Sequence, residues 1–155
     1  MVMLDHGCVH ELSEEARVRL CKLVLACVER RSADLQIISK EIAGPLYKFL
    51  PLLLSPAFAV IGYMDGWLTS ADLRAAYRNQ IPPSVSLEEV GKCVANMHTH
   101  GGNFLGVLHS MGYTRGLLAS INYPERLRLQ SLARYAVLGL LPEAQRKRAL
   151  LEGGM

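Results

Sequence analysis

Apolar residues recur every three or four positions along most of the chain, which is the spacing that one face of an α-helix requires. The clearest stripe consists of Val18, Cys21, Val24, Leu25 and Val28. Further stripes follow within residues 73–77 and 90–97, and another helix is expected over residues 124–138. No run of alternating apolar and polar residues competes strongly with these stripes, so we predict an all-α protein.

Capping residues mark where several of these helices begin. Ser13 precedes two glutamates, which suit the positive end of a helix dipole. Ser86 and Glu89 have the offset of a capping box, and Thr69 with Asp72 has the same form. We therefore predict that a helix starts directly after each of the three hydroxyl residues.

Proline and glycine residues indicate further boundaries. Ser55 followed by Pro56 is typical of a helix start, because proline suits the first helical position. We expect Gly112 to end a short helix that begins at Phe104. Residues 34–38 are expected to form a short extended bridge between two helices.

Composition agrees with a folded helical protein. Of the 155 residues, 50% are apolar and 20% are charged. This length suffices for one compact domain or two small lobes, and the many Leu and Ala residues favour helices. We divide the chain into an N-terminal helical region (1–54), a central helix–loop–helix pair (55–112) and C-terminal helices with a basic tail (113–155).

Two stretches of the central region share one template. Gly66 is followed two places later by Leu68, and Gly102 is followed in the same way by Phe104. With a capped helix between them, these stretches resemble the paired loops of the EF-hand family, of the calmodulin and myosin light chain kind. The resemblance implies that the two loops lie side by side and meet through Leu68 and Phe104. A more degenerate form of the frame can be laid on residues 30–41.

The calcium ligands of that family are largely missing. Calcium takes about six to eight oxygen ligands, drawn from fixed places of the loop. Ile61 and Tyr63 occupy the first and third places of the first loop, and Met97 and Leu108 occupy the first and last places of the second. The upstream frame begins with the cation Arg30. We therefore expect no calcium binding and no cofactor.

With the calcium ligands missing, the resemblance implies a fold that binds a helix but holds no ion. It implies a non-catalytic, calcium-independent adaptor or structural subunit that binds an amphipathic helix of a larger protein in an apolar groove. The residues expected to form the core or the groove are Phe58, Trp67, Leu68, Leu73, Met97, Phe104, Leu108 and Met111. The sequence does not separate these two roles.

Positive charge is concentrated in the last third of a chain whose net charge is +3. The basic residues there are Arg126, Arg128, Arg134, Arg146, Lys147 and Arg148. A solvated helix face is the simpler interpretation of such a cluster. The alternative is a small basic subunit of a ribonucleoprotein or another large assembly, with RNA or an acidic partner on this surface.

A second alternative is an enzyme with a histidine metal site. His98 and His100 are separated by one residue, and His109 follows on the next predicted helix. Zinc takes three or four ligands, and no histidine and carboxylate set completes the shell. Because phosphate-loop, dinucleotide and serine-nucleophile motifs are also missing, we expect no catalytic activity.

The remaining features bear on location. Cys8, Cys21, Cys27 and Cys93 show no CxxC spacing, which favours reduced thiols in the cytoplasm or an organelle interior. The most apolar run, residues 49–63, is short for a membrane span and contains two prolines. We interpret it as buried core, and no signal peptide is predicted.

Overall fold

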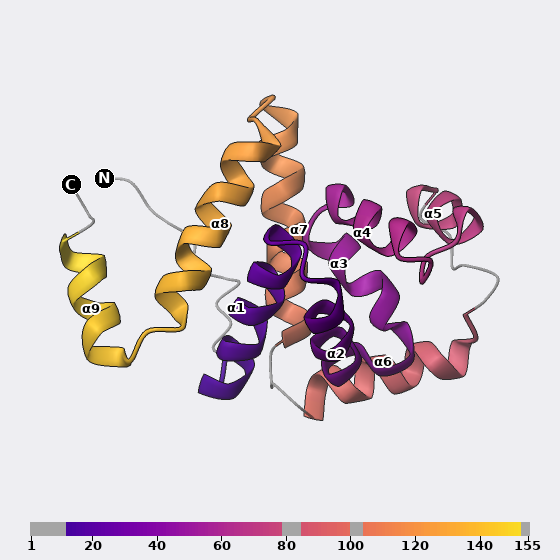
Figure 1. Ribbon diagram of the computed structural model, residues 1–155, viewed down its shortest axis with the longest axis horizontal. Helices are drawn as coiled ribbons and strands as arrows, with labels where there is room; N and C mark the ends of the chain where they lie inside the picture. Colours follow the sequence, from indigo (N-terminus) through magenta and orange to yellow (C-terminus); the bar gives the residue numbers. More distant parts are fainter. Residues whose placement is uncertain (1–11, 79–84, 100–103, 153–155) are drawn as a thin grey trace, which may run out of the picture.

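The computed structural model describes residues 12–78, 85–99 and 104–152, and all of its regular elements are helical. This confirms the all-α prediction for the described residues. The first half contains α1 (Glu14–Val28), α2 (Ser32–Ala43), the 3₁₀ helix η1 (Gly44–Phe49), α3 (Leu50–Leu54), the 3₁₀ helix η2 (Pro56–Phe58) and α4 (Ala59–Met64). The second half contains α5 (Ser70–Tyr77), α6 (Leu87–Thr99), α7 (Phe104–Ser120), α8 (Glu125–Gly139) and α9 (Glu143–Glu152). Figure 1 shows their arrangement.

The predicted caps are confirmed. The Ser13 hydroxyl accepts a hydrogen bond from the Ala16 amide at the start of α1. At the start of α5, Thr69 and Asp72 form the full reciprocal capping box, and Ser86 and Glu89 do the same before α6. These bonds satisfy amide groups that the helix itself leaves unpaired.

Two predicted boundaries are wrong. Residues 34–38 lie inside α2, because Leu35 and Ile42 use helical spacing to enter the core. Gly112 lies in the middle of α7, which continues to Ser120. A glycine ends a helix when it adopts a positive φ, and in the described residues only Gly44 and Gly66 among the glycines do so.

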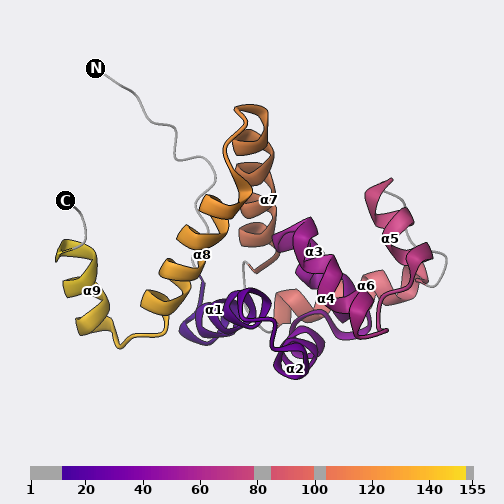
Figure 2. The ribbon, with the colours of Figure 1, turned by 45° about the horizontal axis from the view of Figure 1, so that its top comes forward.

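The buried core lies where α1, α2, α3 and α6 meet, with α7 and α8 packed against it. Its fully buried leucines are Leu23, Leu35, Leu50 and Leu54. Phe104 and Ala136 bring α7 and α8 into the same cluster, so all three predicted regions of the chain share this core. The chain reverses direction between α7 and α8, and the end where these two helices join extends beyond the other helices (Figure 2).

A close contact joins α8 to α1. Gly139 at the end of α8 packs directly on the side chain of Cys21, where an added Cβ would lie 2.5 Å from the sulfur. The thiols of Cys21 and Cys27 are free and buried. Burial raises the pKa of both thiols, that of Cys27 to about 12, so these side chains act as small neutral packing groups.

The central region contains one helix–loop–helix unit among the described residues. Gly66 lies in the turn between α4 and α5 with φ +74°. Gly102 lies outside the described residues. Both views place α3 and α4 between α5 and α7 (Figures 1 and 2), and the side-by-side packing of two loops is not confirmed.

Candidate functional site

An apolar groove of about 1320 Å³ opens between η1, α3, α5, α6 and α7. Its floor is formed by buried side chains, among them Cys93, Met97 and Leu108. Sites for small ligands typically measure about 300–1,000 Å³ and enclose their ligand. A larger groove that is open to solvent suits an extended apolar object better than a small molecule.

The rim of the groove carries large apolar side chains that face water. Leu53, Tyr77, Leu105, Tyr113 and Leu117 all line the groove and are all exposed. Single exposed apolar residues are ordinary, but a contiguous set beside a groove is typical of an interaction surface. Three of the five lie on α7 at intervals of one or two helical turns, so one helix supplies most of the rim.

Two glycines open the α7 wall of the groove. Gly112 and Gly116 are one turn apart on the same face and both line the groove. An added Cβ would meet nothing within 4 Å at either position. Each glycine inside a helix costs about 1 kcal/mol relative to alanine. In the described part of the molecule no neighbouring side chain uses the space that these two residues leave.

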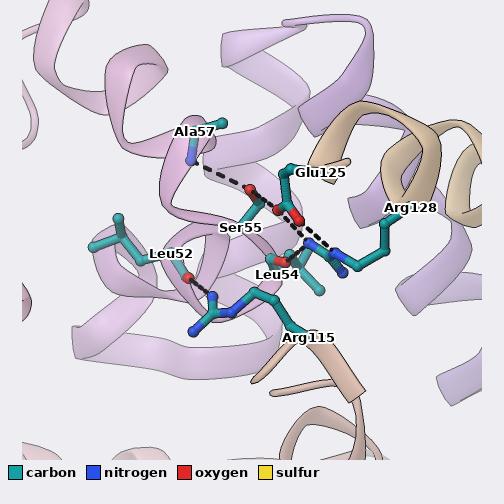
Figure 3. Close-up of polar contacts among 7 residues, drawn as sticks. All are labelled: Leu52, Leu54, Ser55, Ala57, Arg115, Glu125 and Arg128. Atoms are coloured by element: carbon teal, nitrogen blue, oxygen red, sulfur yellow. Dashed lines mark hydrogen bonds and ion pairs between the residues drawn. The ribbon is translucent and has the colours of Figure 1, made fainter. Parts of the chain in front are cut away.

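A polar cluster fixes the α7–α8 pair on the end of α3 (Figure 3). Arg128 on α8 donates to the Leu54 carbonyl oxygen at 2.8 Å, and its guanidinium makes two bonds to the Glu125 carboxylate at 2.6 and 2.8 Å. The Ser55 hydroxyl donates to the same carboxylate at 2.7 Å. The last carbonyls of a helix lack internal partners and favour cations, so this cluster stabilises the end of α3.

The charges within this cluster are mutually balanced. The hydrogen bond from Arg128 is the main reason that the pKa of Glu125 lies below its usual range, with Ser55 contributing in the same direction. Arg115 on α7 makes a second link by donating to the Leu52 carbonyl oxygen at 3.4 Å. Because α7 forms one wall of the groove, these contacts set the distance of that wall from α3.

The residues predicted from sequence divide into three groups. Met97 and Leu108 line the groove, while Phe58, Leu68 and Phe104 are buried and serve as core. The others are half-buried elsewhere: Trp67 stacks on Tyr47, Leu73 lies on α5, and Met111 lines a second cavity between α7 and α8.

Sequence reasoning missed the α7 side of the groove. The spacing of Leu105, Tyr113 and Leu117 is helical and was available as a signal. It was hidden by the expectation that Gly112 ends the helix. The contribution of α3 and α5 had no local signal, since it depends on how distant segments pack.

The predicted basic surface is wrong for Arg128, whose side chain is buried in the polar cluster. Arg146 is half-buried, and Lys147 pairs with Glu143 at 2.7 Å. The side chains of Arg126, Arg134 and Arg148 are exposed, as predicted. The observed placement therefore offers fewer free cations than the sequence suggests.

The histidines are not gathered into a ligand set in the described residues. His98 on α6 and His109 on α7 are exposed, and His100 lies outside the described residues. Within residues 12–78, 85–99 and 104–152, no group of three or more His, Cys, Asp or Glu side chains is placed to hold a metal ion. None of the helices described is both long enough and apolar enough to span a membrane.

Comparisons with known proteins give no assignment for this site. No family model, no curated protein and no solved structure matches the chain.

Proposed function

We propose that this protein is a non-catalytic adaptor or structural subunit that binds an amphipathic helix of a larger protein in the apolar groove, independently of calcium. The observation that carries this proposal is the groove itself, with buried apolar residues as its floor and exposed apolar residues along its rim. Helix-in-groove recognition uses this combination, because the apolar face of the bound helix covers the rim and the floor together.

The size and the lining of the groove favour a helix over other occupants. A helix with its side chains is about 10–12 Å across, and two or three turns of it expose several apolar anchors on one face. Such anchors can pack against the exposed groove residues Tyr113 and Leu117 on α7 and Tyr77 on α5. Aromatic and leucine side chains of this kind supply much of the binding energy of protein interfaces.

The residues of the α4–α5 unit support the proposed independence from calcium. Ile61 and Tyr63 stand where an EF-hand loop places oxygen ligands, and Asp72 is buried and used as a helix cap. The same buried carboxylate pairs with Lys48 at 3.3 Å. We propose that this unit keeps an EF-hand-like shape as a support for α5 and does not sense the ion.

The test is selection from a display library of helices about 18 residues long, which corresponds to roughly 27 Å, with randomised residues on the apolar face. Binders are synthesised, and their affinity is measured by fluorescence anisotropy in calcium and in EDTA. The groove variant is Leu117→Asp, and the control is Ile121→Asp, four residues later in the turn that directly follows α7. The two side chains are matched at 62% and 65% exposure, but only Leu117 lines the groove.

We expect Leu117→Asp to weaken binding at least about tenfold, because it places an unpaired charge in an apolar interface. Ile121→Asp should change the affinity by less than about twofold, and calcium should have no effect. Equal losses in both variants, calcium-dependent binding, or no binder that depends on Leu117 would contradict the proposal.

A further inference from the structure

The groove contains one permanent charge among the described residues that line it, and that charge belongs to Arg115. The side chain is half-buried and makes one hydrogen bond, at 3.4 Å to the Leu52 carbonyl oxygen, within the described part of the chain. The guanidinium has five N–H donors, so this bond leaves most of its capacity for another group. The positive charge of Arg115 contributes to the lowered pKa of Glu125, but the Glu125 carboxylate is already hydrogen-bonded to Arg128 and Ser55.

A wholly apolar occupant would cover the Arg115 guanidinium without offering its charge a partner. Covering the groove removes water from the guanidinium, and a cation that loses water without gaining an anion destabilises the complex. A carboxylate on the occupant removes this penalty, because it forms two parallel bonds with the planar guanidinium. The charge therefore favours an occupant that is apolar on one face and carries an acidic group within that face.

The backbone beside Arg115 is open to close approach. Gly112 and Gly116 flank Arg115 in sequence, line the same groove, and have free space where a Cβ would stand. A short acidic side chain reaches the guanidinium best from a helix that lies close to α7. The two glycines permit that closeness, since they present no side chain to the incoming backbone.

We infer that the groove selects a helix with a single Asp or Glu in its apolar face, which pairs with Arg115 while the helix crosses α7 at Gly112 and Gly116. This inference rests on the proposed function and names the chemistry of its partner. It makes Arg115 a specificity-determining residue. Arg115 discriminates between helices, and the apolar rim supplies general affinity.

The first arm of the test examines the helices selected from the library described above. Asp or Glu should be enriched at one central position of the apolar face. Replacing that residue by Gln in the synthetic peptide should weaken binding about tenfold, and replacing it by Lys should weaken it further. In the variant Arg115→Gln the acidic and the Gln peptides should bind equally well. Because the readout is a ratio between two peptides, a partial loss of folded protein does not affect it.

The second arm tests the close approach at α7. The double variant Gly112→Ala with Gly116→Ala should remain folded by circular dichroism and lose about tenfold in affinity for the acidic peptide. The matched control is Gly91→Ala on α6, where a Cβ also meets nothing within 4 Å but the residue does not line the groove. The control should bind like the unaltered protein.

The outcomes separate the two proposals. Binders that depend on Leu117 but carry no acidic preference, or an unchanged preference in Arg115→Gln, would overturn this inference and leave the proposed function standing. The absence of any such binder would remove both. Dodecanoate is the probe for an acyl chain; if it binds the groove and no helical peptide competes with it, the occupant is a lipid and the inference is wrong.

Discussion

Two glycine-bearing faces of the α7–α8 pair have opposite surroundings. At Gly139 on α8 the space of a side chain is already filled by Cys21 of α1, 2.5 Å from where a Cβ would stand. At Gly112 and Gly116 on α7 the equivalent space is empty and opens into the groove. The face at Gly139 is already packed against another helix of the same molecule. The face at Gly112 and Gly116 is open, and in our proposal a partner helix covers it.

This contrast indicates where stability and binding are separated. The α1–α8 contact and the polar cluster at the end of α3 hold the fold, and substitutions there should cost stability. The exposed rim residues of α7 and its two open glycines contribute little that the isolated chain needs, so substitutions at these positions should affect binding and leave stability intact or improved. The following changes test that division, beginning with the largest expected effect.

Arg128→Ala should lower the free energy of unfolding by about 2–3 kcal/mol, because it removes the buried guanidinium that bonds the Leu54 carbonyl oxygen and the partly exposed Glu125 carboxylate. The buried guanidinium makes three hydrogen bonds in this cluster, and an alanine side chain can make none of them. Urea denaturation monitored by circular dichroism measures the change. The exposed neighbour Arg126→Ala should stay within about 0.5 kcal/mol, and a comparable loss there would contradict the special role of the cluster.

Gly139→Ala should destabilise the protein by about 1–2 kcal/mol, since overpacking at Cys21 outweighs the better helix propensity of alanine. Adding Cys21→Ala should recover much of this loss, because the sulfur is the atom that the new methyl group meets. A double-mutant cycle from thermal and urea unfolding measures this coupling. An unchanged stability for Gly139→Ala would mean that the α1–α8 face is not closed.

Gly112→Ala and Gly116→Ala should each raise the stability by up to about 1 kcal/mol. The physical reason is the lower entropy of the unfolded chain, with no clash in the folded state to offset it. The same denaturation experiments report the sign. If either change destabilised the protein, the α7 face would be packed rather than open.

Acid should weaken the polar cluster before it affects the apolar contacts. The pKa of Glu125 is held below its ordinary value, so its ionised form stabilises the fold above that ordinary value of about 4.3. This contribution is lost as the pH falls from there through the lower folded-state pKa. Glu125→Gln should flatten the acid limb of the profile of stability against pH, measured by urea denaturation at a series of pH values; an unchanged acid limb would contradict this role of the Glu125 carboxylate.

Local signals predicted the parts of the fold that depend on neighbouring residues. The hydroxyl caps at Ser13, Thr69 and Ser86 were readable because donor and acceptor lie three residues apart. The length of α7 was not, because a glycine in a helix and a glycine at its end look alike in sequence. The buried state of Arg128 was hidden as well, since its partner carbonyl at Leu54 is far away along the chain.

The groove was predicted as a kind of site but not as a set of residues. Met97 and Leu108 were expected at the core or the groove from their apolar spacing, and both are buried and line the groove. Tyr77 and Leu53 lie on segments whose packing no local pattern encodes. Exposed apolar residues at a rim look like ordinary surface positions until the walls are placed around them.

The most direct test of the central claim is a map of amide and methyl chemical shift changes by NMR when a selected helical peptide is added. The account predicts the largest changes at the groove residues Leu53, Tyr113 and Leu117. The exposed apolar residues Val28 and Ile37, on α1 and α2 away from the groove lining, should not change. Shifts centred on α1 and α2, with the α7 wall unaffected, would show that the groove is not the binding surface.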